Sequence, residues 1–220
     1  MVAVPLLWQQ LAGDEGDVSR AAVAKPSVPR FRVALQAGHW RANDLPEEQH
    51  AVRDAAGGAT AGGVVEWEVN LAIAREAARM LVARGVAVDV LPARVEPGYR
   101  ADAFVSIHAD GNLDEGVGGF KSAPSVRDRS GRAAALNEAL VAGYAGATGL
   151  GTNPTITADM TGYYAFDRRR FRYAIDARTP AVVLETGFLS NGRDREVIVA
   201  RPQVAATGIA RGVLDFLRVS

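Results

Sequence analysis

The feature of this sequence that most limits its fold is the alternation of short apolar segments, typical of strands, with longer segments of helical periodicity. Strands separated by helices imply a mainly parallel, buried sheet that is covered on both faces. We therefore expect an α/β fold: a single domain with a twisted, mainly parallel (mixed) sheet and helices on both faces. The expected strands are 31–35, 86–91, 103–108 and 181–184, with 117–122 as a further candidate, and the expected helices are 65–84, 131–148 and 203–217.

The length of 220 residues suits one domain with a well-buried core. Residues 1–30 mix small, polar and proline residues without sustained periodicity, so we expect an N-terminal linker or arm there. Residues 31–220 then form the catalytic-sized domain. Within it, residues 40–63 are polar and rich in glycine, and we expect a long loop without clear elements.

Composition excludes several classes of protein. The 25 basic residues match the 25 acidic ones, so no bulk field favours nucleic acid as a partner. The absence of cysteine excludes disulfides and thiolate metal sites. No apolar run approaches the ~20 residues of a transmembrane segment, and residues 2–8 make a poor signal peptide because a proline interrupts them and no basic residue precedes them. We expect a monomer.

Polar, chemically active side chains follow three of the expected strands. His39 and His108 stand at the ends of the first and third segments, and Glu185 closes the last one. Parallel sheets bind ligands beyond the carboxyl ends of their strands, so these groups are expected to share one crevice. Two imidazoles and one carboxylate form a recurrent catalytic zinc set, because they leave one coordination position for water. The sequence thus favours a zinc site.

Two acids at the start of the long helix compete as the third ligand. The residues three and four positions apart from Glu66 continue an apolar stripe, so Glu66 is expected to face the sheet. The corresponding positions around Glu68 are largely charged, which predicts a surface residue. A buried carboxylate is costly unless it is paired or metal-bound. Glu66 is therefore the preferred ligand.

Each of these residues also has a structural interpretation. A histidine at a strand end is often only hydrogen-bonded, and Glu66 could simply favour the positive end of the helix dipole. Glu185 could be a core carboxylate that accepts hydrogen bonds from loop amides. Elsewhere we expect His50 to be exposed, Asn191 to cap a helix, Tyr163 and Tyr164 to fill a core, and Arg168, Arg169, Arg170 and Arg172 to form a solvated face.

Four segments, in order, resemble the zinc-dependent N-acetylmuramoyl-L-alanine amidases of the amidase-3 type, which cut peptidoglycan. The resemblance extends over about Arg32 to Leu217. One match alone would be weak, whereas four in the right order are specific. They are a strand ending in Gly-His at 33–39, Glu-x-x-x-Asn-Leu-Ala at 66–72, Ala-Asp-x-Phe-Val-Ser-Ile-His-Ala at 101–109, and Pro-Ala-Val-x-Leu-Glu-x-Gly-Phe-Leu-Ser-Asn at 180–191.

The resemblance implies zinc ligands at His39, Glu66 and His108 and a catalytic glutamate at Glu185. It implies hydrolysis of the amide between N-acetylmuramic acid and L-alanine, a peptidoglycan or muropeptide substrate, and a place outside the cytoplasm, in the periplasm, the cell wall or the medium. Trp40 departs from the pattern, since the family commonly has glycine there, and the loop up to Glu66 is longer than usual. These departures bear on the substrate groove rather than on the metal set.

Two other functions stay open. The same ligand set would serve a zinc carboxypeptidase or amidohydrolase acting on free peptides. A non-catalytic peptidoglycan-binding module with the same fold is the third alternative, although binding alone does not require the carboxylate of Glu185.

Overall fold

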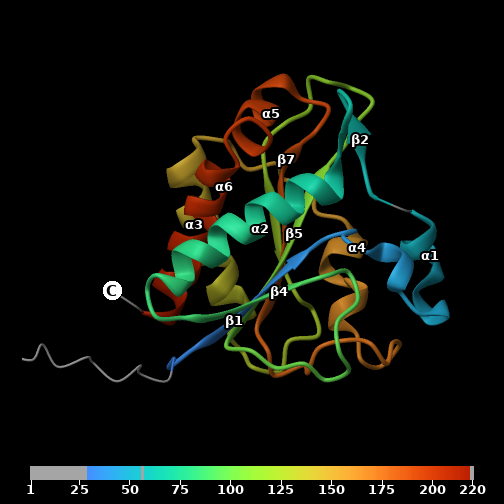
Figure 1. The fold of residues 1–220 in the computed structure, drawn as a ribbon, viewed down its shortest axis with the longest axis vertical. Helices are drawn as coiled ribbons and strands as arrows, with labels where there is room; N and C mark the ends of the chain where they lie inside the picture. Colours follow the sequence, from blue (N-terminus) through green and yellow to red (C-terminus); the bar gives the residue numbers. More distant parts are fainter. Residues whose placement is uncertain (1–28, 56, 219–220) are drawn as a thin grey trace, which may run out of the picture.

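The computed structural model describes residues 29–55 and 57–218, and these form an α/β domain around one five-stranded sheet (Figure 1). The strand order is β4-β1-β5-β7-β6, and every neighbouring pair is parallel except β6 with β7. The expected mixed, mainly parallel sheet is confirmed. The strands are β1 (Arg32–Ala37), β4 (Ala87–Leu91), β5 (Ala103–Asp110), β6 (Lys121–Pro124) and β7 (Ala181–Phe188), and a separate hairpin pairs β2 (Thr60–Ala61) with β3 (Val64–Val65).

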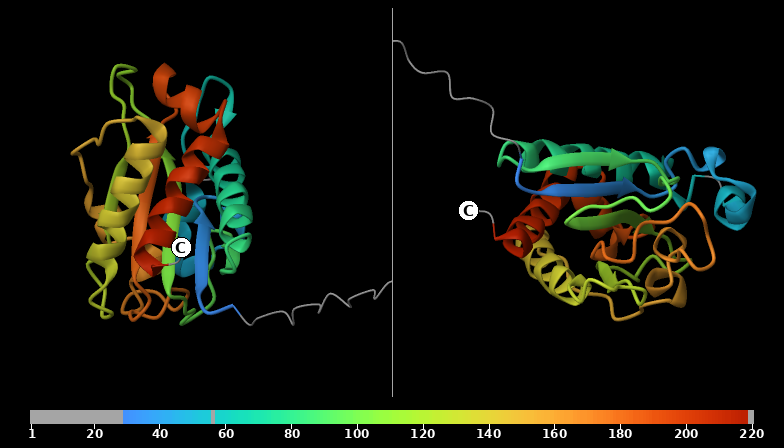
Figure 2. Two further views of the ribbon diagram at one scale, coloured as in Figure 1. Left: turned by 90° about the vertical axis from the view of Figure 1, so that its left-hand side faces the viewer. Right: turned by 90° about the horizontal axis from the view of Figure 1, so that it is seen from below.

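Three long helices cover one face of the sheet: α2 (Glu66–Val82), α3 (Ala133–Thr148) and α6 (Pro202–Leu217). They lie side by side in the left-hand view of Figure 2, with α6 in contact with both α2 and α3. Their apolar sides enclose the strand residues that point to this face, among them Leu35, Ile107 and Leu184. This side holds the larger part of the hydrophobic core.

The opposite face is covered by short elements: α4 (Ala158–Thr161) and the 3-10 turns Tyr164–Phe166 and Ala42–Asp44. Here Phe104 of β5 packs edge to face against Phe166, with ring centroids 5.7 Å apart. Alternate residues of a strand point to opposite faces, so β5 supplies Phe104 to this core and its neighbours Ala103 and Val105 to the other. The helices expected on both faces are present, but the long ones share one face.

Helices α3 and α6 approach closely because glycines line their contact. A Cβ on Gly143 would lie 2.6 Å from the backbone nitrogen of Gly212 and 2.8 Å from the carbonyl oxygen of Gly208. Side chains at these positions would force the two helices apart. The glycines therefore allow α6 to pack directly against α3.

Several local expectations need correction. Residues 40–63 are not a featureless loop, because they contain the 3-10 turns Ala42–Asp44 and Glu47–Gln49 and the short helix α1 (His50–Asp54). The strand expected at 117–122 lies at Lys121–Pro124, since Gly119 adopts φ 92° and delays the extended conformation. The linker expected at 1–30 lies, up to residue 28, outside the described residues. Among the described helices, none combines the length and apolarity required to cross a bilayer.

Candidate metal centre

The structure brings His39, Glu66 and His108 together at the carboxyl-terminal edge of the sheet. His39 follows β1, His108 lies in β5, and Glu66 is the first residue of α2. One potential ligand atom from each residue lies within 4.8 Å of the other two. Three elements far apart in the sequence therefore meet at one point.

The backbone at Gly38 and His39 has the conformation and the space that the cluster requires. His39 has φ 59°, in the left-handed region that non-glycine residues seldom adopt and that is frequent at functional sites. The preceding Gly38 lies against the ring of His108, and a Cβ at this position would overlap that ring. Glycine is therefore required at position 38 for the two imidazoles to approach, with ring centroids 5.2 Å apart.

Glu66 is held by hydrogen bonds to both of its carboxylate oxygens. The amide of Ala59 donates to Oε2 at 2.8 Å, and the side chain of Asn70, one helical turn further along α2, donates to Oε1 at 3.1 Å. Asn70 also donates to the carbonyl of Gly38 at 3.1 Å. Gly58 packs directly against the site, because a Cβ at this position would overlap the Glu66 carboxylate.

Each of the two ring nitrogens of His108 has a polar partner. Its Nδ1 lies 2.9 Å from Oε1 of Glu66, and its Nε2 lies 3.0 Å from the hydroxyl of Tyr163. The Tyr163 contact fixes the orientation of the ring and leaves Nδ1 directed toward the cluster. Metal-binding histidines commonly have such a partner on their second nitrogen.

Burial and mutual charges set the ionisation of the three groups in the metal-free protein. For Glu66, burial acts to raise the pKa, but the hydrogen bond and charge of His108 and the charge of His39 outweigh it, and the pKa falls to about 2. Burial lowers the pKa of His39. Burial also acts to lower the pKa of His108, yet the carboxylates of Glu66 and Glu185 raise it overall. At neutral pH the cluster holds an ionised carboxylate and a neutral His39.

Glu185 pairs in register with His108 and lines the same cavity of about 380 Å³ as the three clustered residues. Burial raises the pKa of Glu185 to about 7; the charges of Glu66 and Asp110 act in the same direction, whereas His108 and Lys121 oppose them. Within the described part of the chain, no loop amide donates to its carboxylate. The structural interpretation of Glu185 as a core carboxylate held by loop amides is therefore not supported.

A groove of about 460 Å³ adjoins this cavity and runs along the segment 157–171. His39, His108 and Glu185 line its inner end, while Tyr163 and Tyr164 form part of its wall. The two tyrosines are buried, as expected for core residues, and also border the groove. A substrate in the groove would reach both the cluster and Glu185.

The three clustered side chains fit a divalent zinc ion. Two imidazole nitrogens and a carboxylate oxygen are a donor set that zinc prefers, and tetrahedral bonds of about 2.1 Å would place the donors about 3.4 Å apart. The shortest donor separations between Glu66 and the histidines are 2.9 Å to His108 and 3.7 Å to His39. These separations join Oε1 of Glu66 to Nδ1 of His108 and Oε2 of Glu66 to Nε2 of His39, so one nitrogen of each ring lies near the carboxylate.

The structure also places the residues for which the sequence predicted no catalytic role. Glu68 and His50 are exposed and lie outside the cluster, as predicted. Asn191 caps helix α5 (Gly192–Ile198), accepting hydrogen bonds from two amides of its first turn. Three arginines of the expected solvated face are exposed but also border hollows: Arg170 lines the groove, and Arg168 and Arg169 line a second cavity.

Two positioning residues of the site were not identified from the sequence alone. The sequence could have indicated the role of Asn70, because it lies one turn from Glu66 on the same side of the helix. It could not have indicated the role of Tyr163, since this residue belongs to a segment without periodicity. Its contact with His108 joins parts of the chain 55 residues apart.

The α/β sheet carries a His-Glu-His cluster and a further glutamate at its carboxyl-terminal edge. This combination indicates a hydrolase with a candidate metal centre. The family model described as N-acetylmuramoyl-L-alanine amidase matches residues 33–215. The chain belongs to this family. It is accordingly a hydrolase of the amide bond between N-acetylmuramic acid and L-alanine in peptidoglycan. A search of curated proteins gave no significant match.

Solved structures with similar folds carry the same description. The N-acetylmuramoyl-L-alanine amidase AmiC2 of Nostoc punctiforme is 22% identical, with a TM-score of 0.62 over 86% of this chain and 97% of that one. The amidase Ami1 of Mycobacterium smegmatis is also 22% identical, with a TM-score of 0.62 over 88% and 99%. The catalytic domain of CwlV from Bacillus (Paenibacillus) polymyxa is 21% identical, with a TM-score of 0.59 over 86% and 99%. These likenesses support the fold described above.

Proposed function

We propose that this amidase holds Zn²⁺ through His39, Glu66 and His108 and uses Glu185 as its general base and general acid. The observation that carries the proposal is the meeting of these four side chains in one cavity at the end of a groove. Zinc bound there would supply a water nucleophile at neutral pH and polarise the amide carbonyl. The protein's residues account for the remaining steps.

Glu185 handles the proton. As water attacks the amide carbon, the Glu185 carboxylate accepts a proton from the water, and it then delivers this proton to the departing nitrogen of L-alanine. A general acid and base works best when its pKa lies near the operating pH. Burial raises the pKa of Glu185 to about 7 in the metal-free protein, which suits both halves of this role.

Other residues of this chain position the reacting groups. Asn70 and the amide of Ala59 hold the carboxylate of Glu66, and Tyr163 orients the ring of His108. The groove wall formed by segment 157–171 would hold the glycan or the stem peptide against the cluster. All four candidate site groups belong to one chain, which supports action as a monomer. Because the substrate is peptidoglycan, we propose that the protein acts outside the cytoplasm, in the periplasm, the cell wall or the medium.

Digestion of purified sacculi and of defined muropeptides tests this function. We expect release of stem peptides with a new amino group on L-alanine and no cleavage between amino acids. A chelator should abolish the release, and added Zn²⁺ should restore it. Cleavage of free peptides at their carboxyl ends would instead identify a carboxypeptidase. Binding to sacculi without any product would identify a binding module.

A further inference from the structure

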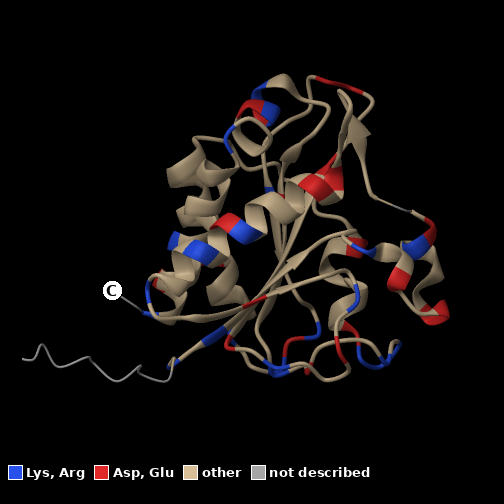
Figure 3. Cartoon of the chain, viewed as in Figure 1, with Lys and Arg blue, Asp and Glu red and all other residues tan. Residues whose placement is uncertain are grey.

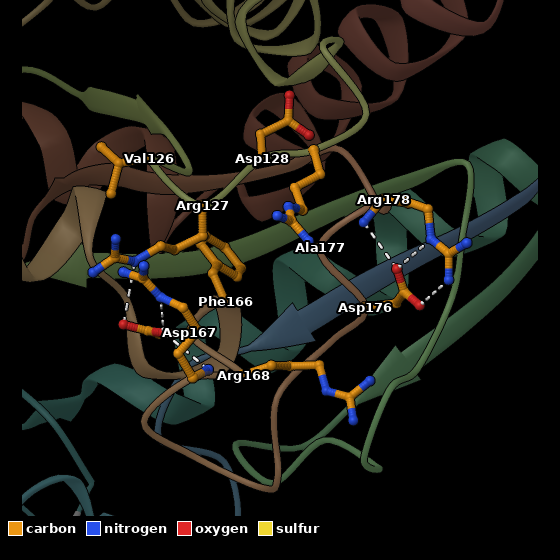
Figure 4. A pocket seen from close by; sticks show the side chains of 11 residues that line it. Val126, Arg127, Asp128, Phe166, Asp167, Arg168, Asp176, Ala177 and Arg178 are labelled. Atoms are coloured by element: carbon orange, nitrogen blue, oxygen red, sulfur yellow. Dashed lines mark hydrogen bonds and ion pairs between the residues drawn. The ribbon is translucent and has the colours of Figure 1, made fainter.

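A second cavity, of about 750 Å³, lies near the start of β7, whereas the candidate metal centre lies at the carboxyl-terminal edge of the sheet. Figure 4 shows the side chains that line this cavity. It is formed by the segments 126–129, 166–169 and 176–178, which follow β6 and precede β7. Ala181, at the start of β7, is four residues from Glu185, or about 13 Å along the strand. No described residue lines both this cavity and the groove, so the two hollows are distinct.

The cavity is strongly cationic. Five arginines and three aspartates line it, which leaves an excess of two positive charges in a protein whose net charge is zero. Figure 3 shows basic and acidic residues gathered along the loops at this end of the molecule. The arginines are Arg127, Arg129, Arg168, Arg169 and Arg178.

All three aspartates of the cavity are already engaged by the protein. Asp128 accepts a hydrogen bond from the amide of Ala133 at the start of α3. Asp167 is buried and forms an ion pair with Arg127 at 3.2 Å. The carboxylate of Asp176 is held by Arg178 at 2.9 Å and by a further arginine outside the cavity. Their oxygens therefore position arginines and a helix end.

Two of the arginines have no such carboxylate. Within the described residues, the guanidinium groups of Arg129 and Arg168 form no ion pair. Figure 4 shows the side chain of Arg168 extending away from Asp167. Arg129 is anchored through its backbone, since its amide donates to the carbonyl of Ala177 at 2.7 Å. Two unpaired guanidinium groups thus border a hollow whose other charges are fixed.

We propose that this cavity binds a phosphate group, free or carried on a polymer, through Arg129 and Arg168. Guanidinium groups bind phosphate and carboxylate in the same two-pronged way. A carboxylate carries one charge on two oxygens that lie in one plane. A phosphate carries up to two charges and directs its oxygens tetrahedrally, so it can accept from two guanidinium groups that approach from different directions.

Calorimetric titration of the full chain with inorganic phosphate and with polyphosphate tests the proposal. We expect saturable binding of both at one shared site, with polyphosphate displaced by inorganic phosphate. Replacing both Arg129→Ala and Arg168→Ala should weaken binding at least about tenfold, because two charge-assisted hydrogen-bonding groups are lost. Binding of inorganic phosphate alone would assign the site to the free ion, whereas much tighter polyphosphate binding would assign it to a polymer.

A matched control separates a built site from general charge. Arg84→Ala with Arg211→Ala removes the same charge from exposed positions outside the cavity and should leave binding unchanged. Equal weakening by both double variants would overturn the proposal, as would equal affinity for poly-L-glutamate or no saturable binding. Cleavage of a small soluble muropeptide should be the same in the Arg129→Ala, Arg168→Ala variant, so the test is independent of the proposed zinc chemistry.

Discussion

The buried carboxyl group of Glu66 and the half-buried one of Glu185 share one cavity, and their surroundings shift their pKa values in opposite directions. Hydrogen bonds and imidazole charges stabilise the ionised form of Glu66, with a pKa of about 2, while desolvation and the charges of Glu66 and Asp110 raise the pKa of Glu185 to about 7. A permanently ionised carboxylate suits a metal ligand, and one that titrates near neutrality suits proton transfer. The environments alone therefore separate two roles for the same residue type.

This separation predicts different losses in two variants. Glu66→Ala should lose both bound zinc and activity, because two histidines alone hold the metal weakly. Glu185→Ala should retain zinc and lose about 10²- to 10⁴-fold in kcat, the usual contribution of a general acid or base. Metal analysis of the purified variants, with kcat on a muropeptide, measures both. Equal zinc loss in the two variants would contradict the assignment.

A second pair of variants isolates the support of His108. Tyr163→Phe removes the hydroxyl that lies 3.0 Å from Nε2 of His108, and zinc affinity should fall about 10- to 100-fold, as is usual for the loss of such a partner. Tyr164→Phe is the matched control, since its hydroxyl donates to the carbonyl of Ala93 instead. Competition with a zinc-sensitive dye measures the affinities. An unchanged affinity in Tyr163→Phe would exclude this supporting role.

At the scale of single residues, the sequence was informative where periodicity or position in a motif determined orientation. The helical phase correctly predicted that Glu66 faces inward and Glu68 faces solvent. The positions of the strand ends correctly predicted that His39 and His108 lie close together. Tyr163 could not be found in this way, because its segment has no repeat that indicates a face. Its position depends on how segment 157–171 packs against the finished sheet.

Among the elements, the contact of α3 with α6 gives a sharp test of close packing. Gly143→Ala should lower the free energy of unfolding by about 1–3 kcal/mol, because the added methyl group would overlap the backbone of α6. Gly146→Ala, on the same helix but with nothing within 4 Å of the added Cβ, should raise it by about 0.5–1 kcal/mol through helix propensity. Urea denaturation measures both. A stabilised Gly143→Ala would contradict the described contact.

The start of α3 predicts a dependence of stability on pH. Burial acts to raise the pKa of Asp128, but hydrogen bonds from Ser130 and from the amide of Ala133 outweigh it and leave the pKa below its ordinary value. A carboxyl group with a lower pKa in the folded state stabilises the fold above its unfolded pKa, and this stabilisation is lost as pH falls through the folded pKa.

We therefore compare the protein with its Asp128→Asn variant, in which one of the two accepting oxygens is lost. The variant should be less stable by about 1 kcal/mol at pH 7, a typical net contribution of one intramolecular hydrogen bond. The two stabilities should converge below about pH 3, where the aspartate is protonated in both states. Urea denaturation across this range provides the measurement. A difference that does not change with pH would refute an electrostatic contribution from Asp128.

Long elements were predictable from the sequence and short ones were not. The apolar runs of β1, β5 and β7 and the periodicity of α2 and α6 extend over enough residues to indicate their type. The one-turn elements within 40–63 are too short to show a period. The antiparallel direction of β6 depends on its pairing with β7 rather than on any local pattern.

For the molecule as a whole, the candidate metal centre joins β1, β5 and α2, so zinc binding should stabilise the entire domain. At a zinc concentration 100 times the Kd, linkage contributes about 2.7 kcal/mol, which corresponds to a rise in Tm of about 5–10 °C for a chain of this size. Thermal unfolding with zinc and with chelator measures it. Glu66→Ala should lose the shift, whereas the control His50→Ala should keep it. A zinc-dependent rise in Glu66→Ala would place the stabilising ion elsewhere.

The order of strands also has a consequence for how the enzyme is made. Strand β7 carries Glu185 and is the last strand in the chain, yet it lies between β5 and β6. While the ribosome has yet to deliver residues 181–188, β5 and β6 have no neighbour on their facing edges, and such open edges favour association with other chains. A nascent or truncated chain can contain all three candidate zinc ligands and still lack Glu185, the proposed proton-transfer group. On the proposed mechanism, catalysis would begin only when synthesis of the sheet is complete.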